Sequence, residues 1–254
     1  MSKISPYPTS THAYRFLDII IAFFVVVLII SNVASSAKIV DLGLSLFGFW
    51  GIPPVRLAFD GGTLLFPFAY VLGDVLTEVY GFKVTRRVIW TGFITLAFAS
   101  LFFFVLRVLP GEALWEERAG SAAYNAILGG MSTGGIALAS LSAFLAGKFS
   151  NSIILSRLKV LMKGRALWVR IIGSSLVGQL IDSLIFVSVA SLTGVFSWEL
   201  FVTLVVTNYL FKVAIEVIVF PFTLLAVRKL KAAEGIDVYD VGVNFNPFSW
   251  KDSK

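Results

Sequence analysis

The sequence predicts an all-α membrane protein, a bundle of six transmembrane helices with both termini in the cytoplasm. Of its 254 residues, 57% are hydrophobic and 14% are charged, whereas about 25% are charged in an average soluble protein. The apolar residues gather in runs long enough to cross a bilayer, which takes about 20 residues per helix. Lysine and arginine gather in alternate connections between these runs, as expected of cytoplasmic loops. A soluble single domain is therefore excluded.

Six apolar runs follow one another along the chain. They cover residues 16–34, 64–80, 88–109, 134–155, 168–192 and 200–227. The second run is short because Gly61 and Gly62 precede it and Gly81 follows it. We expect residues 1–15 to form a cytoplasmic segment, residues 16–227 to form the six-helix transmembrane domain, and residues 228–254 to form a cytoplasmic tail.

The basic residues predict the orientation. Fifteen of the 21 lysines and arginines lie before the first run, in or next to the connections between the second and third and between the fourth and fifth, or after the sixth, and four lie in or next to the opposite connections. Cytoplasmic loops carry this excess of positive charge. Connections rich in basic residues alternate with connections poor in them, and an even number of spans with both termini in the cytoplasm agrees with this order. The remaining two, Lys148 and Lys212, lie within the runs.

Two connecting segments have a character of their own. Residues 42–59 are apolar, but their glycines and prolines break a long helix. We therefore expect an interfacial or re-entrant segment between the first and second spans. Residues 112–118 have the pattern of a short amphipathic helix on the outer surface, where Trp115 suits the membrane interface.

Polar side chains within the apolar runs are the candidates for a functional site. An ionisable group at the centre of a bilayer costs at least about 2.5–3.5 kcal/mol, so it needs a partner or a task. Residues three or four apart lie on one helical face, and the second, fifth and sixth runs each carry such a polar face. The expected substrate-binding residues are Asn32, Tyr70, Asp74, Thr77, Glu78, Gln179, Asp182 and Asn208. Lys212 and Glu216 are expected to form a supporting ion pair or to couple protons.

Structural roles compete with these assignments. Glu78 lies nearer the cytoplasmic end than Asp74 and could reach Arg86 or Arg87 at the interface. Lys212 has acidic candidates on its own helix and on others, namely Glu216, Asp182 and Asp74. The glycines and serines of the fourth and fifth runs suit close helix packing, and those of the fourth run also suit a homodimer face.

The residue inventory argues against an enzyme. The chain has no cysteine, which excludes disulfides, thiolate metal sites and cysteine nucleophiles. The one histidine, His12, lies outside the runs, so no histidine-based triad or metal cluster is expected within them. A membrane protease using Asp74 and Asp182 would lack any recognised motif. We expect no catalytic residue, no metal and no cofactor. We also expect no nucleic-acid partner, because the basic residues are distributed over several loops as the membrane topology requires and do not form one patch.

Several motifs resemble the queuosine precursor transporter family. The most specific is FPFAY at residues 66–70, followed by GDVLTEVYG at residues 73–81 and by Arg86 and Arg87. The same order of motifs continues with ASLSAF at residues 139–144 and EGIDVYD at residues 234–240. Between them, the fifth and sixth runs match at Ser174, Ser175, Gly178, Gln179, Asp182, Ser183, Asn208, Tyr209, Lys212, Glu216 and Pro221. The family carries a glutamate near the position of Lys148, so no carboxylate role is transferred there.

The resemblance implies a six-helix importer in the inner membrane. Its substrates would be 7-cyano-7-deazaguanine or 7-aminomethyl-7-deazaguanine, which are salvaged into the tRNA nucleoside queuosine. A guanine-like ring offers adjacent N1–H and N2–H donors, so Asp74 or Asp182 is expected to accept from it. Two alternatives stay open: a transporter of another planar heterocycle, such as a nucleobase or vitamin, and a membrane subunit that captures substrate for an energising partner.

Overall fold

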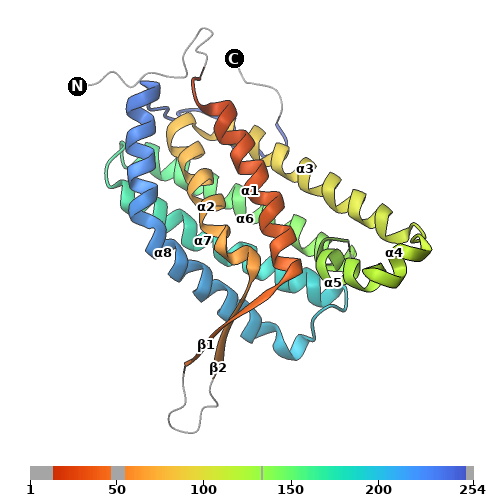
Figure 1. The fold of residues 1–254 in the computed structure, drawn as a ribbon. Coiled ribbons are helices and arrows are strands. Elements are labelled where there is room, and N and C mark those ends of the chain that lie inside the picture. Colours follow the sequence, from red (N-terminus) through yellow and green to blue (C-terminus); the bar gives the residue numbers. More distant parts are fainter. Residues whose placement is uncertain (1–13, 47–54, 133, 250–254) are drawn as a thin grey trace.

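A computed structural model describes residues 14–46, 55–132 and 134–249. The long helices of this part are α1 (Leu17–Ala37), α3 (Phe82–Val108), α6 (Gly134–Leu161), α7 (Leu167–Leu192) and α8 (Phe201–Glu234). The shorter helices are α2 (Phe66–Val75), α4 (Ala113–Arg118) and α5 (Gly120–Ser132), and single turns form η1 (Gly61–Leu64), η2 (Leu76–Tyr80) and η3 (Trp198–Leu200). Two strands, β1 (Ile39–Leu46) and β2 (Val55–Asp60), complete the described elements. Figure 1 shows the helices as one bundle.

Within the described residues, five helical stretches are long and apolar enough to cross a membrane. They are Leu17–Ala37, Phe82–Val108, Gly120–Leu161, Leu167–Leu192 and Leu204–Glu234. The second predicted span is not among them, because it folds as the ten-residue helix α2 followed by the π turn η2. The multi-pass helical character is confirmed, whereas the count of six spans is not.

The segment between the first two predicted spans forms a β-hairpin in its described part. Strands β1 and β2 pair antiparallel, with Ile39 opposite Asp60 and Leu46 opposite Val55. Residues 47–54 of the segment lie outside the described residues. The hairpin leaves the bundle at the end where α1 finishes and α2 begins (Figure 1). In the described strands, the backbone groups are satisfied by pairing between β1 and β2.

Helices α6 and α7 pack closely because two glycines face each other. A Cβ atom placed on Gly147 would lie 2.7 Å from the Cβ of Asp182 and 3.1 Å from the carbonyl oxygen of Gly178. A Cβ atom on Gly178 would lie 2.7 Å from the Cβ of Asn151. Small residues let membrane helices approach to this distance. Polar side chains of the two helices are thereby brought next to each other.

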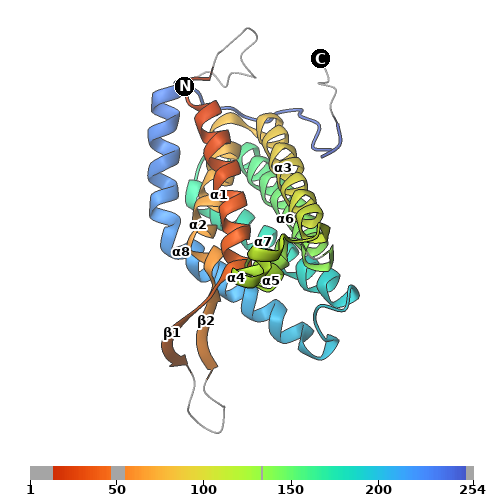
Figure 2. The ribbon, with the colours of Figure 1, turned by 45° about the vertical axis from the view of Figure 1, so that its right-hand side comes forward.

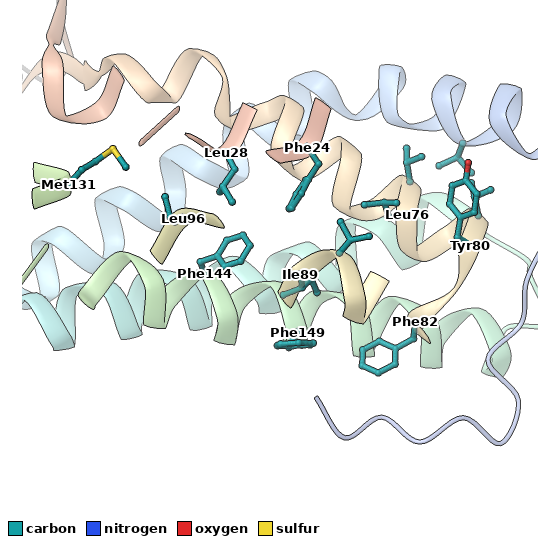
Figure 3. Close-up of a cluster of buried hydrophobic side chains, with 14 residues drawn as sticks. Phe24, Leu28, Leu76, Tyr80, Phe82, Ile89, Leu96, Met131, Phe144 and Phe149 are labelled. Atoms are coloured by element: carbon teal, nitrogen blue, oxygen red, sulfur yellow. The ribbon is translucent and has the colours of Figure 1, made fainter. Parts of the chain in front are cut away.

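The apolar core runs along α1, α2, α3 and α6. Figure 3 shows its side chains in a row from Met131 at one end to Tyr80 and Phe82 at the other. Gly92 of α3 lies at its middle, where a Cβ atom would lie 3.0 Å from Phe24 and 3.3 Å from Phe144. Large apolar side chains also cover the outside of the bundle, for example at Phe98 and Ile218. A soluble monomer rarely exposes so much apolar surface, whereas lipid accommodates it.

The residues after α8 pack against the bundle end where α1 begins. The two ends meet directly, since Glu234 accepts hydrogen bonds from the backbone N–H groups of Arg15 (2.9 Å) and Phe16 (2.8 Å). Figure 2 shows the segment after α8 crossing this end towards α3. Asp240 accepts from the backbone N–H of Phe82 at the start of α3 (2.9 and 3.0 Å) and from the Ser156 hydroxyl (2.5 Å). We call residues 236–247 the strap.

Candidate functional site

A small pocket opens between α2, α7 and α8. It holds about 260 Å³ of empty space, its open mouth included. Its lining combines polar and apolar side chains: Tyr70, Val71, Asp74, Gln179, Lys212, Ile215, Glu216, Val219 and Thr223. A neighbouring hollow of about 190 Å³ shares Gln179 and Glu216 with it. An apolar wall with a few convergent polar groups is typical of small-molecule sites.

The charged side chains of α8 pair across to α7. Lys212 donates a hydrogen bond to Asp182, and Gln179 donates one to Glu216. Of the three acidic candidates considered for Lys212, which were Glu216, Asp182 and Asp74, the structure places Asp182 in an ion pair with it. The amide of Gln179 takes the place beside Glu216 that the ammonium group was expected to fill.

Two acceptor atoms at the pocket have no hydrogen-bond partner within the part of the chain that the structure describes. They are the second oxygen of Glu216, Oε1, and the amide oxygen of Gln179, also Oε1, and both atoms are buried. A buried acceptor without a donor costs about 1–3 kcal/mol. The buried hydroxyl groups of Ser175 and Ser183 on α7 are likewise without a partner among the described residues, and Ser175 lies beside Glu216, so the site holds polar groups that a bound molecule could satisfy.

Asp74 lies at the α2 side of the pocket with its own partner. Its carboxylate accepts a hydrogen bond from the Asn151 side chain at 2.8 Å. Lys148 lies close by, 3.8 Å above the centre of the Tyr70 ring, and donates to the Ala69 carbonyl at 3.1 Å. The ammonium group of Lys148 thus places a positive charge against the Tyr70 ring, which forms the aromatic wall of the pocket.

Glu78 lies away from the pocket, at the bundle end that carries the strap. Its carboxylate is fully buried and contacts Lys231 (2.7 Å), Arg170 (3.1 Å) and Lys159 (3.6 Å). These cations come from α8, α7 and α6, whereas Arg86 instead donates to strap carbonyls. The competing structural role considered for Glu78 was an ion pair with Arg86 or Arg87, and the structure shows ion pairs with cations of later helices.

Strap residue Asp237 completes this charge cluster. Lys159 (2.6 Å) and Lys231 (2.7 Å) both contact its carboxylate. Partial burial alone would raise the pKa of Asp237, but the two ammonium groups prevail and hold that pKa below its ordinary value. The cluster joins the ends of α6, α7 and α8 to the strap.

The remaining sequence-predicted residues do not line the pocket. The Thr77 hydroxyl of η2 donates to the Gly73 carbonyl (2.9 Å) and shares a second hydrogen bond with the Ser152 hydroxyl of α6 (3.2 Å). Asn32 accepts from Ser140 at 3.2 Å between α1 and α6. Asn208 is half-buried on α8, one turn before Lys212. Of the ten predicted residues, the pocket lining includes Tyr70, Asp74, Gln179, Lys212 and Glu216, with Asp182 paired to one of them.

Sequence reasoning missed the apolar part of the lining. The missed lining residues on α8 are Ile215, Val219 and Thr223. They lie at helical spacing from Lys212 and Glu216, on the same side of the helix. This i, i+3, i+4 continuation was a usable signal. Three-dimensional proximity alone links Lys148 and Asn151 of α6 to Asp74. Among the described residues, no group of three or more histidine, cysteine, aspartate or glutamate side chains is arranged to hold a metal ion.

Comparisons with known proteins agree on one kind of molecule. Residues 60–226 match a family model described as "Putative vitamin uptake transporter". A "Probable queuosine precursor transporter" of Bacillus subtilis is 30% identical over 173 residues, covering 66% of this chain and 72% of the relative. The "Queuosine precursor transporter" of Escherichia coli is 26% identical over 193 residues, covering 74% and 77% respectively. No solved structure matches the chain.

Proposed function

The chain belongs to the vitamin uptake transporter family, and we propose that it imports queuosine precursors across the inner membrane. It is a multi-pass membrane protein of a family of transporters, not of enzymes. The proposed substrates are 7-cyano-7-deazaguanine and 7-aminomethyl-7-deazaguanine, for salvage into tRNA queuosine. The relatives, which are named as queuosine precursor transporters, support this substrate class.

The pocket between α2, α7 and α8 is the proposed binding site. The observation that carries this proposal is a buried, partly apolar hollow lined by Tyr70 and by polar groups of two helices. A planar heterocycle needs an aromatic surface for stacking and polar atoms for its edge, as enzyme pockets provide for flipped bases. Asp74 lines this hollow, and Asp182 lies beside it in an ion pair with the lining residue Lys212.

The proposed topology has six membrane-crossing segments and both termini in the cytoplasm. In this arrangement, α2 with η2 enters the membrane as the short second segment. The contact of Glu234 with the start of α1 supports a common side for the two ends of the bundle. The basic residues at that end support the cytoplasm as this side.

The experiment is restoration of queuosine in tRNA. A strain that lacks both precursor synthesis and its own importer receives this gene and a nanomolar supply of 7-cyano-7-deazaguanine. Restored modification supports the substrate class and shows that no dedicated energising partner from the source organism is needed. Failure, with the protein detected in the membrane, contradicts import of this substrate by the chain on its own.

The same strain tests the pocket. Asp74→Asn and Asp182→Asn are both expected to reduce restoration, since each removes a carboxylate at or beside the site. Glu117→Gln, the same kind of change on an exposed carboxylate of α4, is the control. Normal restoration by both pocket variants at normal expression would overturn the proposed site.

The alternative occupant is another planar heterocycle. Competition of guanine and of riboflavin against a labelled deazaguanine distinguishes these ligands on the purified protein. Stronger competition by riboflavin than by the unlabelled deazaguanine would favour a vitamin as the substrate. The oligomeric state of the same preparation decides whether the proposed importer works as a homodimer.

A further inference from the structure

We propose that Glu216 and Gln179 read the substrate, by accepting two hydrogen bonds from adjacent N–H groups of its ring. The ligand class is a 2-aminopyrimidin-4-one ring fused to a second ring, which presents one carbonyl followed by two N–H donors along one edge. This inference rests on the proposed function and assigns its specificity to residues expected only to support the site. It differs from the expectation that Asp74 or Asp182 accepts from the ring.

The free acceptors carry the proposal. Within the described part of the chain, Oε1 of Glu216 and Oε1 of Gln179 are buried and lack a donor. The hydrogen bond from Gln179 to the other oxygen of Glu216 holds the two side chains together. Both residues line the pocket, and a bound molecule would reach the two covered acceptor atoms once these side chains turn towards it. A ligand with two neighbouring donors satisfies both atoms at once.

The other carboxylates near the pocket are already engaged. Asp182 is neutralised by Lys212 in an ion pair. Asp74 accepts from Asn151 at 2.8 Å, and its side chain is almost completely buried. A ligand would have to displace these protein donors in order to use either aspartate. Glu216 is held less tightly: Gln179 donates to one of its oxygens, and beside the other a bound molecule would compete only with the small hydroxyl group of Ser175.

The order of groups along α8 fits the order along the ring edge. Lys212 lies one turn before Glu216, and both line the pocket. When the two N–H groups of the ring meet Glu216 and Gln179, the ring carbonyl beside them would meet the ammonium group of Lys212. Tyr70, on the α2 side, offers an aromatic surface to the same ring. The pocket thus has a complement for each polar atom of that edge.

The test is direct binding to the purified full-length protein in lipid nanodiscs. The ligands are 7-cyano-7-deazaguanine and 7-cyano-7-deazahypoxanthine, which lacks the 2-amino group. For the wild type, loss of one donor leaves an acceptor unmatched, so the second ligand is expected to bind at least about tenfold more weakly. Equal affinity of the wild type for both ligands would overturn the inference and leave the proposed function standing.

The variant Glu216→Gln assigns the effect to its residue. It replaces an acceptor by an amide of the same shape, so the difference between the two ligands is expected to shrink to less than about threefold. Glu199→Gln, an exposed glutamate before α8, is the matched control and should keep the full difference. If Glu216→Gln binds and keeps the full difference, the inference is wrong.

The outcomes separate the two proposals. If the wild type binds neither ligand and fails to restore queuosine, the proposed function is wrong and this inference falls with it. If Glu216→Gln does not fold, Gln179→Leu removes the second acceptor and must show the same loss of discrimination. Full discrimination by Gln179→Leu would overturn the inference on its own.

Discussion

At the scale of single residues, Glu78 shows how a membrane helix tolerates a fully buried carboxylate. Its contacts with Arg170, Lys159 and Lys231 supply the opposite charge that the low-dielectric interior demands. Such a pair contributes little net stability when formed, because both partners lose their hydration. Removal of one partner is costly, since a charge then stays buried without compensation.

We expect Glu78→Ala to lower the free energy of unfolding by about 3–5 kcal/mol. The reason is that Arg170 and Lys159 are themselves almost completely buried and would lose their shared counter-charge. Thermal unfolding in detergent, followed by fluorescence, measures the effect. Glu117→Ala on the exposed helix α4 is the control and should unfold with the wild type. An unchanged transition for Glu78→Ala would contradict the structural role.

The residue types of the site could be predicted from the sequence, but their pairing could not. Helical spacing identified Asp74, Gln179 and Glu216 because a shared face depends only on local geometry. Partners on other helices depend on how the helices rotate and cross, which no local pattern encodes. The sequence therefore left Glu216, Asp182 and Asp74 open as partners of Lys212, and the structure shows an ion pair with Asp182 on α7.

At the scale of elements, the α6–α7 contact depends on the absence of side chains at two glycines. We expect Gly147→Ala to cost about 1–3 kcal/mol, because the new Cβ would lie 2.7 Å from Asp182 and the helices must move apart. The control is Gly173→Ala on α7, whose Cβ would meet its nearest neighbour, Leu158, at 3.9 Å. Its helix propensity should make it neutral or slightly stabilising.

Thermal unfolding of both glycine variants, side by side, is the measurement. A larger loss for Gly173→Ala than for Gly147→Ala would mean that the α6–α7 contact is not closely packed.

The strap should be sensitive to acid through Asp237. The pKa of the Asp237 carboxyl is lower in the folded state than its ordinary value. The ionised carboxylate therefore stabilises the fold at pH values above the ordinary pKa, and this stabilisation is lost as the pH falls through the folded-state pKa. We therefore expect the wild type to be more stable than Asp237→Asn at neutral pH. The difference should persist to about pH 4, the ordinary range of aspartate, and close below it.

The melting temperatures of the two proteins, measured from neutral pH downwards, give this difference. A gap that stays constant well below pH 4 would mean that Asp237 is not stabilised by Lys159 and Lys231.

The elements themselves were predicted with uneven success. The long helices match the apolar runs because spanning length and hydropathy are local properties. Helix α8 runs seven residues past the predicted end at residue 227, up to Glu234, since its last turns are polar but docked by the strap. The hairpin was missed because an apolar segment rich in glycine and proline does not reveal whether its backbone pairs with itself.

At the scale of the whole molecule, the topology can be read with single cysteines, because the native chain has none. We expect Arg165→Cys, between α6 and α7, to react with a membrane-impermeant thiol reagent only from the cytoplasmic side. Glu117→Cys, on α4, should react only from the outside. Both native side chains are exposed, so access rather than burial decides the result. Labelling of intact cells and of inverted vesicles makes the measurement, and labelling from the same side would contradict the proposed orientation.

The charge cluster around Glu78 has a consequence for biogenesis. Ribosomes make the chain from its N-terminus, so the carboxylate on η2 emerges long before Lys159, Arg170 and Lys231 of the later helices. The strap that supplies Asp237 is made later still. Until those residues are made, the carboxylate lacks the counter-ions that surround it in the folded structure. We therefore expect the short second segment to reach its final position late in assembly, because a membrane-buried acidic group without a counter-ion is costly.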